Sequence, residues 1–209
     1  MKLYDCRTAP SPRRVRIFVA EKGLNLDTVP VDLASGEQFR PEFRKINPDC
    51  VVPVLELDDG MYLSEVIAIC HYLEEIEPDP PLFGTTAAER AVALMWNAKS
   101  EQQGLWAMAD AFRNSAKGLK GHALPGPEKY EQIPELAERG KSRVKTFFGK
   151  LNDRLGQREY LAGDSYTIAD ITALVLADFA ARLKIGFSDD EINLRRWYDN
   201  VSARPSAAA

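Results

Sequence analysis

The chain is poor in the residues that build metal centres and disulfide frameworks. Of its 209 residues, only three are cysteine and two are histidine. Cys6, Cys50 and Cys70 form no Cys-x-x-Cys pair and no zinc-ligand spacing, and neither His71 nor His122 lies in a cluster of ligand-type residues. We therefore expect no metal site, no bound cofactor, and reduced thiols of the kind found in a cytosol.

Long apolar runs are also missing. No stretch approaches the roughly 20 apolar residues that a membrane-spanning helix requires. The first residues, MKLYDCR, lack the apolar segment and small-residue cleavage site of a secretory signal. The formal net charge of −4 gives no reason to expect a nucleic acid partner. These absences predict a cytoplasmic protein with neither a membrane nor a nucleic acid as its partner.

The first 80 residues alternate between short strand-like and helix-like segments. A strand at residues 2–6 is followed by a helical run with Val15, Phe18 and Val19 on one face, which ends at Gly23. Further strands are expected at 27–33 and 52–57, a hairpin turn at 59–60, and helices at 41–48 and 64–76. The order β-α-β followed by α-β-β-α favours a small mixed sheet covered by helices.

The composition changes after residue 80. The stretch EPDPPLFGTT is rich in proline and predicts a linker, which we place at residues 81–87. The remainder is helical in pattern, apart from an irregular loop rich in glycine and proline between residues 114 and 134. Helices are expected at 87–113, 135–155, 167–184 and 190–205. The chain is thus predicted to form an α/β domain at 1–80 and an all-helical domain at 88–209.

Five stretches resemble the cytosolic glutathione S-transferase family, and they occur in the family's order. They are APSPRRVRIFVAEKG, GEQFRPEF, VVPVLELDDG, LSEVIAICHYLEE and GDSYTIADI. The resemblance extends over nearly the whole chain. The chain is similar to the bacterial nu, zeta and theta classes but has an atypical active-site loop. It implies a thioredoxin-like N-terminal domain, an all-helical C-terminal domain and a homodimer.

The resemblance gives the proline of VVPVLELDDG a purpose. It implies that Val52-Pro53 is a cis peptide, and that the N–H and C=O of Val52 bind the cysteinyl unit of glutathione as an added strand. Taken alone, the sequence around Pro53 favours a trans proline at a strand start. Glu65 is implied to pair with the glutathione ammonium, and the N–H of Val66 with its γ-glutamyl carboxylate. Without that resemblance, Glu65 is a first-turn acid behind a Ser64 cap.

Several positions depart from the family's polar contacts. Ala9 stands where the serine-type classes have the thiol-activating serine, Val51 replaces a polar residue near the glycyl end, and Val66 replaces the serine that follows the glutamate. Gln38 matches a nu-class glutamine, and the glycyl carboxylate is left to Gln38, Arg40 or a residue from a second subunit. Cys50 is expected to be a passive thiol, although an exposed one would form a mixed disulfide with glutathione.

The group that activates the thiol is predicted to be Ser11, ahead of Thr8 and Cys6. A hydroxyl that donates to sulfur favours the thiolate. Ser11 followed by Pro12 also fits an ordinary helix N-cap, and a hydroxyl can accept from a helix N–H while it donates elsewhere. The backbone N–H groups of the same helix terminus are the alternative activators.

The predicted function is conjugation of glutathione, as co-substrate, to a small hydrophobic electrophile. The alternatives are a glutathione-dependent disulfide reductase or peroxidase, and a glutathione-binding module without catalysis. The electrophile is expected near apolar residues of the first long helix of the second half, with candidates at Trp96, Trp106, Met108 and Phe112. Thr167 and Asp170 form a Thr-x-x-Asp capping box with a structural role.

Overall fold

The computed structural model describes residues 1–209 and divides them into two compact units. The first unit contains Met1–Pro80 together with Leu124–Glu128 and Ala209, and the second contains Pro81–Ala123 and Lys129–Ala208. The proposed domain limits of 1–80 and 88–209 stay a prediction. Part of the segment 81–87 belongs to the second unit's core, because Leu82 and Phe83 are buried and the Ile168 N–H donates to the Leu82 C=O.

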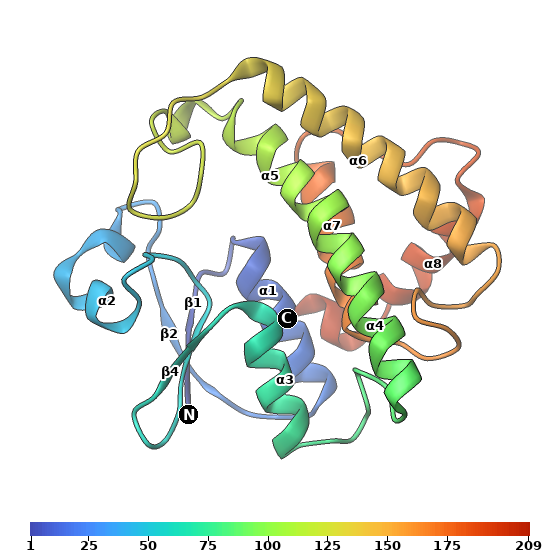
Figure 1. The fold of residues 1–209 in the computed structure, drawn as a ribbon, viewed down its shortest axis with the longest axis horizontal. Coiled ribbons are helices and arrows are strands. Elements are labelled where there is room, and N and C mark those ends of the chain that lie inside the picture. The colour runs from blue at the N-terminus through green and yellow to red at the C-terminus, as the bar shows by residue number, and fades with distance from the viewer. The chain divides into compact units, whose positions relative to one another are not determined.

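A four-stranded mixed sheet forms the centre of the first unit, with strand order β2-β1-β3-β4 (Figure 1). Its strands are β1 (Lys2–Asp5), β2 (Asp27–Pro30), β3 (Val54–Glu56) and β4 (Tyr62–Ser64). β1 is parallel to β2 and antiparallel to β3, and β3 is antiparallel to β4. The predicted thioredoxin-like fold class is therefore confirmed. The predicted third strand is shorter than expected, because residues 52 and 53 lie outside the ladder.

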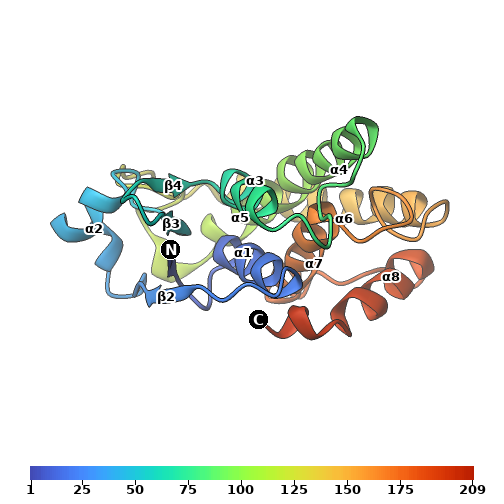
Figure 2. The ribbon, with the colours of Figure 1, turned by 90° about the horizontal axis from the view of Figure 1, so that it is seen from below.

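Helices cover both faces of this sheet. Figure 2 shows α1 (Pro10–Glu21) and α3 (Val66–Ile76) on one side and α2 (Pro41–Ile46) on the other. Successive residues of a strand point to opposite faces, so β3 contributes side chains to the packing on both faces of the sheet. Val54 packs in one cluster with Val31 and Phe43 of the α2 side, while its neighbour Leu55 is buried toward the opposite face.

The second unit is all helical, as predicted. Its helices are α4 (Ala87–Lys99), α5 (Trp106–Arg113), α6 (Pro134–Leu155), α7 (Ile168–Ala181) and α8 (Ile192–Ser202). Every residue of α7 except Asp178 and Ala181 is buried, as expected of a helix that is apolar on all sides. No helix in the chain is both long enough and apolar enough to cross a membrane.

The run predicted as one helix at 87–113 contains a wider turn. Between α4 and α5, Ser100–Leu105 is π-helical. Within this turn lies Gly104, where a Cβ would come within 2.3 Å of the Leu176 side chain and 3.1 Å of Phe147. Only glycine fits this crossing, so the close approach of the π-helical turn to α6 and α7 accounts for a glycine in a helical run.

Candidate functional site

One edge of the sheet brings the start of β3 beside the end of β4. Val54 pairs with Ser64 in the antiparallel register. When this register is continued by two residues, Val52 lies opposite Val66, the first residue of α3. Two stretches that the sequence assigned to the same site are thus brought together by strand pairing.

The end of β1 reaches the same edge. Tyr4 pairs with Val54, so the continued register carries Cys6 to the level of Val52. The N–H of Ala9 donates to the Cys6 C=O at 3.0 Å, and this turn leads into α1. The strand predicted at residues 2–6 ends at Asp5, so Cys6 follows it and is partly exposed. Its sulfur lies 3.5 Å from the Thr8 hydroxyl oxygen.

The main chain of Val52 is available for pairing. The β3 ladder begins at Val54, and the N–H and C=O of Val52 form no hydrogen bond with the chain. The Val52-Pro53 peptide is cis, which confirms the prediction; Asp79-Pro80 is also cis, which the sequence analysis did not anticipate. Val52 therefore offers one donor and one acceptor to an extended ligand, and neither depends on the identity of its side chain.

A buried asparagine fixes the turn that leads to Val52. The side-chain amide of Asn47 donates to the Val51 C=O at 2.9 Å, and its Oδ1 accepts from the Asp49 N–H at 3.1 Å. The Asn47 C=O accepts from the Cys50 N–H at 3.1 Å. The sequence analysis missed this role, although the Asn-Pro-Asp run is typical of a turn closed by an asparagine side chain.

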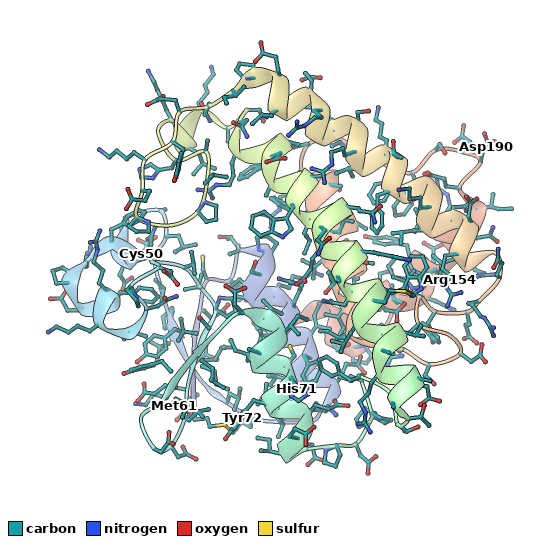
Figure 3. All side chains as sticks on the ribbon, viewed as in Figure 1. Cys50, Met61, His71, Tyr72, Arg154 and Asp190 are labelled. Atoms are coloured by element: carbon teal, nitrogen blue, oxygen red, sulfur yellow. The ribbon has the colours of Figure 1, made fainter.

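Cys50 lies in this turn with its thiol shielded. Its exposed fraction is 3%, and its sulfur lies 3.4 Å from the Pro48 C=O. Figure 3 labels it on the segment between α2 and β3. Its φ of 55° is in the left-handed region, which residues other than glycine adopt infrequently. This burial agrees with the passive thiol and does not fit a mixed disulfide that needs exposure.

The N-terminus of α3 presents free donors beside Val52. The N-cap is Glu65, with φ of 69°, and its C=O accepts from the Ile69 N–H at 3.0 Å. The first-turn N–H groups of Val66, Ile67 and Ala68 have no partner within the helix, and together with the helix dipole they favour an anion. The Glu65 side chain is exposed and is not used as a cap.

Ser64 was predicted as the cap of this helix, and that alternative is wrong. Ser64 is the last residue of β4 and makes no side-chain capping bond to α3. The physical reason is its strand pairing with Val54, which places the change of direction one residue later, at Glu65.

The predicted capping role of Ser11 is also wrong. α1 begins at Pro10, so Ala9 is the N-cap, without a side-chain capping bond, and Ser11 is the second helical residue. Proline suits the first helical position, and either Pro10 or Pro12 could have filled it. Because both prolines lack an N–H, Ser11 supplies the only free backbone donor of the first turn as well as a hydroxyl. The alternative hypothesis was that several backbone N–H groups of this helix terminus activate the thiol. Only the Ser11 N–H is available for that role.

Gln38 and Arg40 lie on the segment before α2. Gln38 belongs to a short 3₁₀ turn, Glu37–Phe39, and its buried side-chain Oε1 has no donor. Arg40 is exposed at the N-cap of α2. No hydrogen bond connects either side chain to Val51 or Val52. Their role toward the glycyl carboxylate therefore stays a prediction.

The four apolar candidates of the helical unit have different environments. Met108 is fully buried, whereas Trp106 is 57% exposed. The Trp96 ring lies 4.5 Å from the Lys99 ammonium, and the Phe112 ring packs edge-on against Phe179 at 5.3 Å. Met108 is therefore a core residue. Of the four candidates, only Trp106 exposes more than half of its surface.

The fold and the sheet edge define a class of protein. A thioredoxin-like unit offers an unpaired backbone segment and a helix N-terminus to an extended, anionic peptide ligand, and it is joined to a separate helical unit. This combination is typical of proteins that bind a small peptide thiol.

Comparison with known proteins identifies the family. Residues 8–76 match the model of the glutathione S-transferase N-terminal domain, and residues 112–205 match that of the C-terminal domain. Glutathione S-transferase 2 of Saccharomyces cerevisiae is 35% identical over 209 residues, which cover 99% of this chain and 87% of the relative. The chain belongs to the glutathione S-transferase family. The predicted family and the predicted glutathione transferase activity are thereby confirmed.

Two further relatives bear on structure and reaction. A glutathione S-transferase domain-containing protein of Marinobacter aquaeolei VT8 has a crystal structure that matches with a TM-score of 0.91 at 38% identity, covering 99% of both chains. The disulfide-bond oxidoreductase YfcG of Escherichia coli (strain K12) is 30% identical, over 98% of this chain and 92% of the relative.

Proposed function

We propose that the protein is a transferase that conjugates glutathione, as co-substrate, to small hydrophobic electrophiles. The observation that carries this proposal is the end of the sheet where Val52, with a free N–H and C=O, lies two residues before Val54, while Val54 pairs with Ser64, two residues before α3. The cysteinyl unit of glutathione pairs with Val52, and the γ-glutamyl carboxylate accepts from the amides of Val66 and its neighbours. The exposed Glu65 carboxylate pairs with the ammonium group.

Binding of glutathione is the first test, with Glu65 as the residue whose change matters most. We expect Glu65→Gln to weaken glutathione about tenfold, because one charge-assisted contact contributes roughly 1.5–3 kcal/mol. Isothermal titration calorimetry measures the change, and Glu75→Gln, an exposed carboxylate of the same helix, serves as the control. If the unmodified protein gives no heat with millimolar glutathione, the proposed function is wrong.

Ser11 is proposed as the group that stabilises the thiolate. Its hydroxyl and its N–H are both part of the first turn of α1, and neither neighbouring proline competes as a donor. We expect Ser11→Ala to raise the pKa of bound glutathione by about one unit and to lower kcat/KM roughly tenfold at neutral pH. The ultraviolet absorbance of the thiolate follows the titration of the bound glutathione.

Thr8→Val is the companion variant, because Thr8 is the competing hydroxyl. A Thr8→Val enzyme that titrates like the unmodified protein supports Ser11. The reverse result, an unchanged thiol pKa in Ser11→Ala and a raised one in Thr8→Val, transfers the role to Thr8.

Glutathione-dependent disulfide reduction is the second candidate, supported by the similarity to an oxidoreductase of that name in Escherichia coli. Conjugation of an activated aryl halide, assayed beside reduction of a model disulfide, separates the two reactions. We further propose a cytoplasmic homodimer. No disulfide joins the three cysteines, which is consistent with a reducing compartment, and sedimentation analysis reports the oligomeric state.

A further inference from the structure

The loop between α5 and α6 carries a short segment that belongs to the first unit. Leu124–Glu128, which we call the strap, groups with Met1–Pro80, while Ala123 before it and Lys129 after it group with the helical unit (the loop is yellow-green in Figure 1). Its sequence, Leu-Pro-Gly-Pro-Glu, limits backbone freedom on both sides of one glycine.

The base of this loop is well fixed within the helical unit. The Ala123 N–H donates to the Tyr130 C=O at 3.0 Å, and the Tyr130 N–H donates to the Gly121 C=O at 3.0 Å. The Arg113 guanidinium donates to the His122 C=O at 2.7 Å, and the Gln132 amide donates to the Arg113 C=O at 2.7 Å. The strap is therefore the tip of an ordered loop, held at its base by main-chain and side-chain bonds.

The tip of the strap lies against the turn that fixes Val52. Gly126 has a φ of +108°, and a Cβ built there would lie 3.6 Å from the Asp49 C=O. Asp49 belongs to the Asn47–Val51 turn, which Asn47 holds by its side-chain amide. Asn47 thus supports the turn from within, and the Asp49 C=O lies where a side chain at Gly126 would contact it.

The direction of the ligand says which part of glutathione meets this turn. An added strand that is antiparallel to Val51–Pro53 and has its γ-glutamyl end at the N-terminus of α3 begins near Pro53 and ends near Val51. The glycyl end therefore faces the Asn47–Val51 turn. Val51 has no polar side chain to bind it, so at this position only the backbone of the turn meets the glycyl end.

We propose that the strap positions the Asn47–Val51 turn for the glycyl end of glutathione, and so sets the preference for the tripeptide over γ-glutamylcysteine. This inference rests on the proposed function. The strap acts through the turn and takes no part in the chemistry, so its loss changes KM for glutathione and leaves kcat at saturating glutathione unchanged.

The test is calorimetric titration with glutathione and, separately, with γ-glutamylcysteine. The variants are Gly126→Ala, which puts a Cβ on a left-handed residue against Asp49, and replacement of the strap by five residues of glycine and serine. We expect the unmodified protein to prefer glutathione about tenfold, and both variants to lose most of that preference while they bind the dipeptide as before. Steady-state assays show the expected rise in KM without a change in kcat.

Gly121→Ala is the matched control. Gly121 also has a positive φ, +76°, but lies at the base of the loop, where a Cβ meets only the Glu131 carboxylate at 3.9 Å. It should retain the full preference for glutathione. The inference is overturned if the strap variants keep that preference, if they weaken both ligands equally, or if the unmodified protein binds both ligands alike. Failure of the unmodified protein to bind either ligand is a different result, which refutes the proposed function itself.

Discussion

Replacing Lys22 by methionine is expected to destabilise the protein by about 3–5 kcal/mol, the range found when one partner of a buried ion pair is removed. The Lys22 side chain is 0% exposed, and its ammonium lies 2.6 Å from a Glu74 carboxylate oxygen. It also donates to the Pro80 C=O at 2.6 Å and lies 5.6 Å from the centre of the Phe18 ring. Without the lysine, the Glu74 carboxylate stays buried beside α1 and loses the ammonium that lies 2.6 Å from it.

A double-mutant cycle distinguishes the pair from simple loss of packing. Lys22→Met combined with Glu74→Leu should recover most of the lost stability, because an apolar pair of similar size avoids the desolvation of both charges. Urea denaturation followed by circular dichroism gives the free energies. The exposed pair of Lys141 and Glu138 is the control, since its removal should cost less than about 1 kcal/mol. Equal costs for the two pairs would show that burial of Lys22 contributes nothing.

Asp170→Ala is expected to be similarly damaging, at about 3–5 kcal/mol, because it leaves several buried donors unsatisfied. One carboxylate oxygen accepts from the Leu161 N–H at 3.0 Å and the Trp197 indole N–H at 2.9 Å. The other accepts from the N–H and the hydroxyl of Thr167, which confirms the predicted capping box. Asp170 thus joins the segment before α7, the helix itself and α8, a wider role than a cap.

Asp178→Ala is the matched control for this prediction. Asp178 lies on the same helix and accepts from the Tyr198 hydroxyl at 2.6 Å in a partly exposed position. Its loss should cost about 1 kcal/mol or less. Thermal and urea denaturation measure both variants, and equal destabilisation would mean that the four donors around Asp170 add little.

Asp170 is also expected to make the stability of the protein depend on pH. Burial raises the pKa of this carboxyl from 3.8 to about 6, against the opposing effect of its four hydrogen bonds. The folded state therefore holds the proton more tightly than the unfolded state. The contribution of this group is greatest below pH 3.8 and is lost as the pH rises through about 6. The unfolding free energy of the unmodified protein, minus that of Asp170→Asn, should accordingly fall across this range.

Local patterns in the sequence predicted most of the fold. Periodicity and turn residues predicted the order of the elements, and the resemblance added the cis peptide. Helix starts were less certain, because Pro10 and Pro12 both suit a first helical turn and local sequence does not choose between them. The position of Ser11 followed from that choice and was wrong.

Contacts between distant residues left no local pattern. Lys22 is the C-cap of α1, and nothing near it in the sequence indicates its partner Glu74, which is far along the chain. Asn47 could have been suspected from the turn-forming residues beside it. The approach of Gly126 to Asp49 joins segments whose separation in sequence hides any relation. Such features depend on tertiary structure and require coordinates.

The unpaired main chain of Val52 affects how this protein can change over time. Every amino acid except proline carries the same amide and carbonyl, so mutations at that codon preserve the two groups that we propose bind glutathione. Substitutions at Val52 can change the surface around it and so alter which electrophiles are accepted, while the proposed backbone contacts with glutathione are kept. Routine alanine scanning would report such a position as unimportant.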